Sequence, residues 1–151
     1  MDIFTVGFFG HRYIEDFFNV EKGLENVIKE LISSHEYVDF LVGRNGDFDR
    51  IVSSAVIRAK RTLFCANSSH VCILPYKISG IEYYTAYYDE VEICDPSAQA
   101  HPMAAINIRN RYIVDRSDLI VCYVSRCKGG AFQAVKYSEK QGKIIINLYR
   151  P

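Results

Sequence analysis

The sequence lacks a long apolar run. No stretch approaches the roughly 20 consecutive apolar residues that a membrane-spanning helix needs, and the first residues do not show the charged, apolar and small-residue succession of a secretory signal. These absences predict a cytoplasmic protein with no membrane partner. The 151 residues suit one domain, spanning residues 1–151, which can bury a core without disulfides or metal.

The sequence also lacks a surplus of either charge. It has 18 basic and 18 acidic residues, which cancel to a formal net charge of +0. Bulk nucleic-acid binding favours an excess of Lys and Arg. We therefore expect no bulk nucleic-acid binding, although a neutral chain is compatible with one local basic pocket.

Metal-ligand and cofactor motifs are absent as well. No pair of cysteines has zinc-ligand spacing, and neither the G-x-G-x-x-G fingerprint nor a Gly-Lys-Ser/Thr phosphate loop occurs. We predict no metal and no cofactor. Three of the five cysteines lie in apolar runs, which is typical of buried reduced thiols in a cytoplasmic protein; the five are Cys65, Cys72, Cys94, Cys122 and Cys127.

What the chain does contain is a regular alternation of short apolar runs and amphipathic segments. Helices are predicted at 17–32, 48–61 and 104–116, at 131–141, and over a short tyrosine-rich segment at 83–88, while 95–102 is predicted to be a loop. Alternation of this kind predicts an α/β, Rossmann-like three-layer sandwich, with a mainly parallel sheet and helices on both faces. The predicted strands are 3–9, 38–42, 70–75, 91–94, 118–124 and 143–148.

Four loops follow predicted strands and carry the candidate functional residues: 10–12, 43–47, 75–80 and 126–130. In an open parallel sheet, ligands bind outside the carboxyl ends of the strands. Three of these loops combine glycine with a charged residue. The recurrence of that combination favours a shared binding site, although each loop alone is more typical of a tight turn.

Individual residues in these loops suggest roles. Arg12 either offers a planar fork for phosphate or carboxylate or pairs with a surface acid. His11 is either a ligand-facing donor or a histidine that satisfies the strand end. Asp47 is placed to cap the second helix or to hold a ribose hydroxyl. Gly129 and Gly130 open the last helix, where exposed amides and the helix dipole favour an anion.

Two further groups have open interpretations. Arg109, Arg111 and Asp115 lie on a helix beside a buried strand, and the i,i+4 spacing of the last two is typical of a salt-bridged helix face, although one or two arginines could reach the pocket. Tyrosines at 83, 84, 87 and 88 suit base stacking, a core stripe or a dimer surface.

These motifs together carry a resemblance to a known family. In order they are Gly10-His11-Arg12, the Gly43 to Asp49 turn into a helix, Leu74-Pro75-Tyr76, the block from Arg109 to Asp118, and Gly129-Gly130 followed by Ala134 to Tyr137. Nearly the whole chain resembles the YpsA-like branch of the SLOG superfamily, which is related to the Smf/DprA proteins and to the "Lonely guy" phosphoribohydrolases. The Arg-Asn-Arg-Tyr block is the most specific part of the resemblance.

The resemblance implies a Rossmann-like fold that holds a nucleotide or nucleotide-derived ligand at the strand ends, with the Gly-Gly loop on the phosphate. Some SLOG domains are sensors of nucleotide signals in bacterial and phage-defence systems. Either Asp47 or Asp49 takes the family's acidic position. The predicted ligand-binding residues are Gly10, His11, Arg12, Gly43, Arg44, Gly46, Asp47, Asp49, Pro75, Arg109, Arg111, Gly129, Gly130 and Gln133.

The sequence departs from the Lonely guy enzymes at the residues that matter for catalysis. Their Gly-Gly-x-Gly-Thr-x-x-Glu motif ends in a catalytic Glu, whereas here Lys136 occupies that register. A lysine does not supply the carboxylate that such glycosidic cleavage needs, so binding is favoured over catalysis. The alternatives are an N-glycosidic hydrolase of nucleoside monophosphates using His11 or Asp47, and an interaction module that forms a homo-oligomer through the tyrosine-rich segment.

Overall fold

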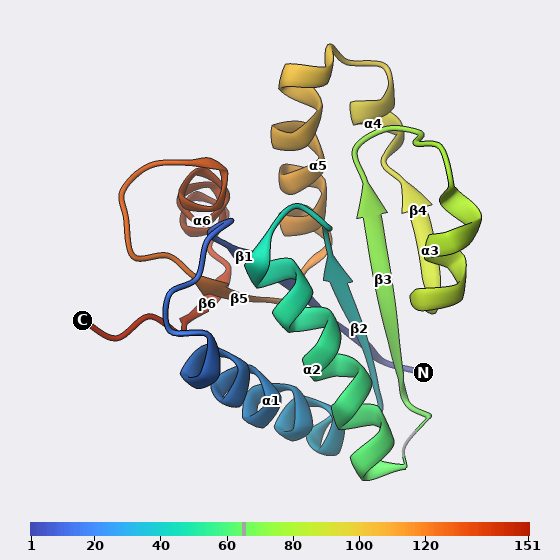
Figure 1. Ribbon diagram of the computed structural model, residues 1–151, viewed down its shortest axis with the longest axis vertical. Coiled ribbons are helices and arrows are strands. Elements are labelled where there is room, and N and C mark those ends of the chain that lie inside the picture. Colours follow the sequence, from blue (N-terminus) through green and yellow to red (C-terminus); the bar gives the residue numbers. More distant parts are fainter. Residues whose placement is uncertain (65) are drawn as a thin grey trace.

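A parallel β-sheet forms the middle layer of the computed structural model, which describes residues 1–64 and 66–151 (Figure 1). Its strands are β1 (Ile3–Gly10), β2 (Tyr37–Val42), β3 (Ser68–Leu74), β4 (Glu90–Ile93), β5 (Leu119–Tyr123) and β6 (Ile144–Asn147). The helices are α1 (Phe17–Ser34), α2 (Asp47–Leu63), α3 (Ile81–Tyr87), α4 (Asp95–Ala98), α5 (Pro102–Arg116) and α6 (Gly130–Lys140).

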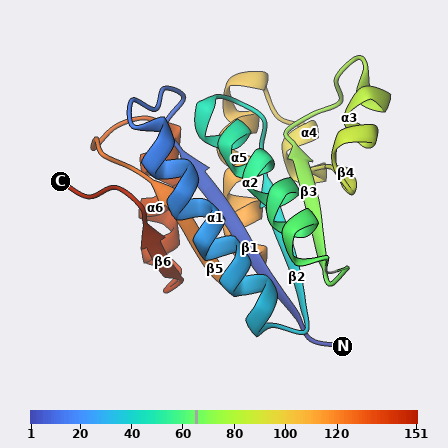
Figure 2. The same ribbon diagram turned by 60° about the horizontal axis from the view of Figure 1, so that its bottom comes forward.

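The strand order is β4-β3-β2-β1-β5-β6, and every neighbouring pair is parallel. The chain runs outward from β1 to β4, then crosses back to place β5 on the other side of β1. Helices α1 and α2 lie together on one face of the sheet, and α5 and α6 lie together on the other (Figures 1 and 2). The predicted Rossmann-like three-layer sandwich is therefore confirmed.

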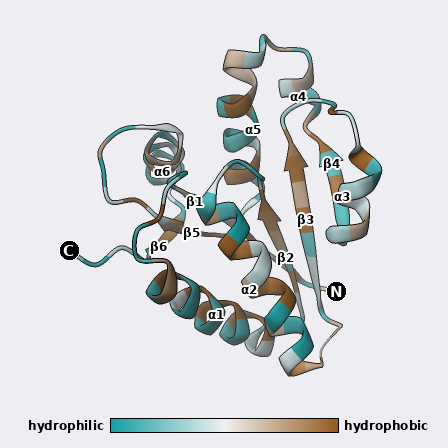
Figure 3. Cartoon of the chain, in the orientation of Figure 1, coloured by the Kyte–Doolittle hydropathy of each residue, from teal (hydrophilic) through white to brown (hydrophobic). Residues whose placement is uncertain are grey.

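Each face of the sheet has its own apolar core, because fully buried strands contribute side chains to both sides. On one face, Phe8 and Phe40 pack against the apolar stripe of α1, which includes Leu24 and Ile28. On the other, Ile120 packs with the buried side chains of α5 and α6. Burying each such side chain contributes about 1.5–3 kcal/mol, and Figure 3 shows the hydrophobic residues concentrated along the strands.

The structure corrects three local predictions. The predicted loop at 95–102 contains the short helix α4. The helix predicted at 104–116 begins earlier, at Pro102; proline suits the first helical position because no partner is needed for the missing N–H. Gly46, and not Asp47, is the N-cap residue of α2, and Asp47 makes no cap bond.

The cysteines behave as buried thiols. Cys72, Cys94 and Cys122 are buried and free, as predicted, and Cys127 is exposed. Burial raises the pKa of Cys72 to about 11 and that of Cys122 to about 12, so these thiols stay protonated and inert. Cys65 lies outside the described residues.

None of the helices in the described part of the chain is both long enough and apolar enough to cross a membrane. That finding agrees with the lack of a long apolar run in the sequence.

Candidate functional site

The main cavity lies at the carboxyl end of β1, at the edge of the sheet where the strand order reverses between β1 and β5. Gly10 and Tyr123 pair in register at the carboxyl ends of these strands, and β2 ends beside them. An α/β sheet has a natural crevice at such a switch point. The cavity measures about 670 Å³, and it brings together eight of the predicted residues: Gly10, His11, Arg12, Gly43, Asp49, Arg109, Gly129 and Gly130.

The remaining predicted residues lie elsewhere. Arg44, Gly46 and Asp47 line a smaller cleft of about 270 Å³, which Arg12 also lines. The last three predicted residues line neither space: Pro75, Arg111 and Gln133. Pro75 follows β3, two strands from the switch point, and is buried with its carbonyl accepting the Ser97 hydroxyl.

Two predicted residues lie on helix surfaces. Arg111 is exposed on α5, where its guanidinium lies 5.1 Å from the ring centre of Tyr137. The same tyrosine donates to Asp115 (2.8 Å), so Tyr137 bridges the pair that the i,i+4 spacing predicted to be a direct ion pair. Gln133 is exposed on α6.

Arg109 and Asp49 form the polar floor of the cavity. Arg109 is only 3% exposed, and it donates to the Ile73 carbonyl (2.8 Å) and to the side-chain oxygen of Asn110 (2.9 Å). It lies so close to Gly43 that a Cβ there would be 3.0 Å from its Nη1. Arg109 therefore both supports the structure, through its bond to the end of β3, and lines the cavity. The sequence left open whether this arginine was structural or reached the pocket, and it does both.

The two candidate acids, Asp47 and Asp49, have different structural roles. Asp49 lines the main cavity and accepts the Asn45 N–H (2.8 Å), and burial raises its pKa although Arg109 and this bond act against the rise. Asp47 accepts the Ile14 N–H (3.0 Å) and pairs with Arg50, and the Ile14 bond is the main reason that its pKa is lowered. Asp49 is thus the cavity-facing acid, and Asp47 holds the loop before α1.

His11 anchors a loop. It is 6% exposed, and its Nε2 accepts the Ser125 N–H (2.9 Å), so the proton of the neutral ring is on Nδ1. Burial, followed by the charge of Arg126, lowers its pKa. This bond ties the segment that continues into Gly129 and Gly130 to the end of β1, and it occupies the nitrogen lone pair that a general base would use.

The glycines serve different purposes. A Cβ on Gly10 would lie 2.1 Å from the ring of Phe48, so Gly10 makes room for α2. Gly46 has φ +142° and lies against the Arg12 backbone. Gly129 has φ +98° with no atom near its would-be Cβ, and Gly130 is equally open. Only the last two present exposed backbone, at the N-terminus of α6, where it can receive an anion.

Several cavity residues escaped the sequence interpretation. Met103, Ile106, Asn107 and Asn110 line the cavity from α5. Their i, i+3, i+4, i+7 spacing is the signature of one helix face, and it would have identified them had the position of α5 relative to the switch point been known. Arg126 and Lys128 also line the cavity.

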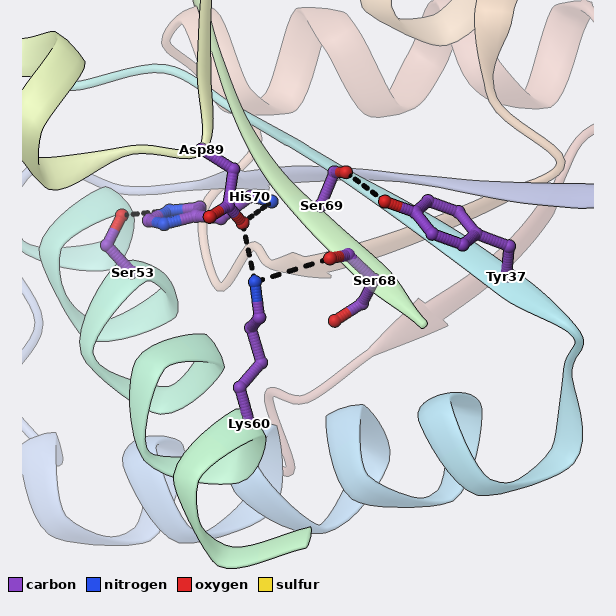
Figure 4. Close-up of polar contacts among 7 residues, drawn as sticks. All are labelled: Tyr37, Ser53, Lys60, Ser68, Ser69, His70 and Asp89. Atoms are coloured by element: carbon purple, nitrogen blue, oxygen red, sulfur yellow. Dashed lines mark hydrogen bonds and ion pairs between the residues drawn. The ribbon is translucent and has the colours of Figure 1, made fainter. Parts of the chain in front are cut away.

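A second polar cluster has residue types that suggest hydrolytic catalysis, but it is buried. Figure 4 shows Ser53 of α2 beside His70 of β3, with 2.9 Å between Oγ and Nε2. Asp89 accepts from the backbone N–H of His70 and not from its ring, and it pairs with Lys60 (2.6 Å). Ser53 and His70 are 1% and 2% exposed, so the cluster joins β3 to α2 without access for a substrate.

No group of three His, Cys, Asp or Glu side chains within residues 1–64 and 66–151 is arranged to hold a metal ion. The polar residues that line the main cavity are instead arginines, a lysine and asparagines, with His11, Tyr13 and Asp49. These groups are suited to an organic anion with hydroxyl or amide functions.

No protein-family model and no curated protein matches the chain. Solved structures do. DNA processing protein A (DprA) from Streptococcus pneumoniae superposes with a TM-score of 0.68 at 13% identity, over 95% of this chain and 49% of that one. The chain shares its fold with DprA. It spans about half the length of that protein.

A second DprA gives the same result. The Helicobacter pylori protein, described by its unique single-stranded DNA binding mode, superposes with a TM-score of 0.65 at 13% identity, over 94% of this chain and 63% of its own. The expectation of no bulk nucleic-acid binding was therefore wrong: the balanced charge of the sequence does not exclude nucleic acid as a ligand. A protein of this fold binds single-stranded DNA, and a balanced total charge does not describe the charge at one edge of a sheet.

Proposed function

We propose that the chain binds a nucleotide or nucleotide-derived ligand in the cavity at the carboxyl end of β1, as a sensor-type protein of the YpsA-like branch of the SLOG superfamily. The observation that carries the proposal is the meeting of Gly129 and Gly130, at the open N-terminus of α6, with Arg12, Arg126 and Lys128 around one cavity. Consecutive amides, a helix dipole and cations together favour phosphate.

The rest of the cavity suits the remainder of a nucleotide. Asp49 and Asn45 supply acceptor and donor groups for sugar hydroxyls, beside the guanidinium of Arg109. Met103 and Ile106 of α5 supply apolar surface for a base. A volume of about 670 Å³ lies within the range of small-molecule sites.

Nucleotide binding should stabilise the protein. At a ligand concentration about 100 times its dissociation constant, the expected gain is roughly 2.7 kcal/mol. A thermal-denaturation panel of AMP, ADP-ribose, cyclic nucleotides and dinucleotides measures it. Gly129→Val, which crowds the open amides and strains a left-handed backbone, should abolish the gain.

Gly142→Val is the matched control. Gly142 has φ +71° just after the other end of α6 and is not among the residues lining the cavity, so this variant has a comparable backbone strain. It should keep the ligand-induced gain on its own lower baseline. A panel that never shifts the midpoint, or a gain that Gly129→Val leaves intact, contradicts the proposal.

Single-stranded DNA is the second candidate ligand, and the DprA likeness is the observation that favours it. The cations at the rim, Arg12, Arg126 and Lys128, would contact the phosphates. Titration with a fluorescent oligonucleotide at several salt concentrations tests this candidate, because the logarithm of affinity falls by about 0.7 per logarithm of salt for each neutralised phosphate.

The hydrolase alternative has less support from the geometry. The Nε2 atom of His11 already accepts the Ser125 N–H. Asp47 does not line the main cavity, and its pKa is lowered, chiefly by the bond from the Ile14 N–H. Lys136 is exposed, and its Nζ lies 3.6 Å from a carboxylate oxygen of Glu139. Release of free base from AMP that is lost on His11→Ala or Asp47→Asn would favour the hydrolase alternative.

The interaction alternative has partial support from the tyrosine-rich segment. Tyr83 and Tyr87 are exposed but Tyr88 is buried, so only part of this group could form a dimer surface.

A further inference from the structure

A second cleft adjoins the main cavity. It measures about 270 Å³, and it shares the lining residues Arg12, Tyr13 and Asn45 with the larger space, so the two are adjacent. Beyond these shared residues it is lined by Arg44 and Arg50, with Gly46 and Asp47 at the start of α2. Three arginines thus line a space next to the main cavity.

The charge of this cleft is strongly one-sided. Within residues 1–64 and 66–151, neither Arg12 nor Arg44 forms an ion pair, and Asp47 is the only acid among the cleft residues. That acid is already shared between Arg50 and the Ile14 N–H. Two of the three arginines therefore have no anionic partner in a chain whose total charge is zero.

The cleft is also held in shape. The Arg12 carbonyl accepts the Asp47 N–H (2.8 Å), and Gly46 lies so close to Arg12 that a Cβ would be 2.7 Å from its Cα. Arg44 lies over the ring of Tyr84, 5.0 Å from its centre, which orients the guanidinium plane. These contacts hold Arg12 and Arg44 in place, which reduces the entropy lost when they bind an anion.

We infer that the ligand carries a second phosphate, which binds among Arg12, Arg44 and Arg50 while the first binds at Gly129 and Gly130. The ligand class is then two nucleotide units joined through phosphate, rather than a nucleoside monophosphate. Two linkages supply this chemistry: the phosphodiester of an oligonucleotide and the pyrophosphate of a dinucleotide. The inference rests on the proposed function, because it extends the same site.

Isothermal titration with probes matched in base and sugar tests it. The probes are nucleoside 5′-monophosphates, 5′-phosphorylated dinucleotides (pNpN) and pyrophosphate-linked dinucleotides (NppN). A two-phosphate probe should bind at least about tenfold more tightly than the matched monophosphate, because the second phosphate adds charge-assisted hydrogen bonds to arginine. A tenfold change corresponds to about 1.4 kcal/mol. Whichever of pNpN and NppN binds more tightly identifies the linkage.

Variants locate the second phosphate. Arg44→Ala and Arg50→Ala should weaken the tighter two-phosphate probe by about tenfold and leave the monophosphate within about twofold. Arg61→Ala, an exposed arginine in the last turn of α2, is the control and should change neither. Equal affinities for the matched probes, or equal effects of Arg44→Ala and Arg61→Ala, overturn the inference alone. Failure of every probe to bind overturns it together with the proposed function.

Discussion

Gly10→Ala should destabilise the protein by about 3 kcal/mol or more, although it adds one methyl group. The ideal Cβ would lie 2.1 Å from the ring carbon Cγ of Phe48 and 2.5 Å from its Cβ. Phe48 is fully buried in the first turn of α2 and has no room to withdraw. Overpacking of this kind typically costs 1–3 kcal/mol, and here the clash falls partly on atoms close to the backbone. Urea denaturation measures the change.

A double-mutant cycle identifies the cause. Phe48→Ala alone should cost about 3–5 kcal/mol as a cavity-creating change, and the double variant Gly10→Ala/Phe48→Ala should cost clearly less than the sum. Gly130→Ala is the control, because nothing lies within 4 Å of its would-be Cβ; it should stay within about 0.5 kcal/mol. If the free-energy costs of the two single variants simply add in the double variant, contact with Phe48 is not the reason that position 10 requires glycine.

Acidification from pH 6.5 to pH 4 should remove on the order of 3 kcal/mol of stability through His70. Burial lowers the pKa of His70 from 6.5 to about 4, against the opposing charge of Asp89. Between these values the unfolded chain binds a proton that the folded chain refuses, so the free energy of unfolding falls as the pH falls. A shift of this size corresponds to about 1.4 kcal/mol per pH unit across the window.

His70→Gln isolates this contribution from the carboxylates, whose shifts run in both directions. The difference in unfolding free energy between the wild type and His70→Gln should be largest near pH 7 and should shrink as the pH approaches 4. A difference between wild type and His70→Gln that stays constant from pH 7 to pH 4 would contradict the account of a buried neutral His70 held by Ser53.

The fold was predictable because its layers depend on local patterns. The stripe from Val20 to Ile32 predicts a helix with one buried face, and short apolar runs such as 38–42 predict strands buried on both sides. Strand order is not a local property. Nothing near Leu119 in the sequence indicates that β5 returns to the side of β1, since that depends on how the whole chain closes.

The assembly of the candidate site could be predicted only in part. The loops at 10–12, 43–47 and 126–130 meet, but the loop at 75–80 does not, because β3 lies two strands from the switch point. Asp47 and Asp49 differ by two residues on one helix, so they point in different directions and only the orientation of α2 separates their roles. The role of His11 was also hidden, because its partner Ser125 lies more than 100 residues away.

The central claim is that phosphate binds at the backbone of Gly129 and Gly130. The most direct measurement is a titration of isotopically labelled protein with the tightest-binding nucleotide of the panel, following amide resonances by NMR. We expect the amide signals of Gly129 and Gly130 to shift most, together with those near Arg12, and the signal of Gly142 to stay unchanged. Saturable binding that leaves the Gly129 and Gly130 amides unmoved would contradict it.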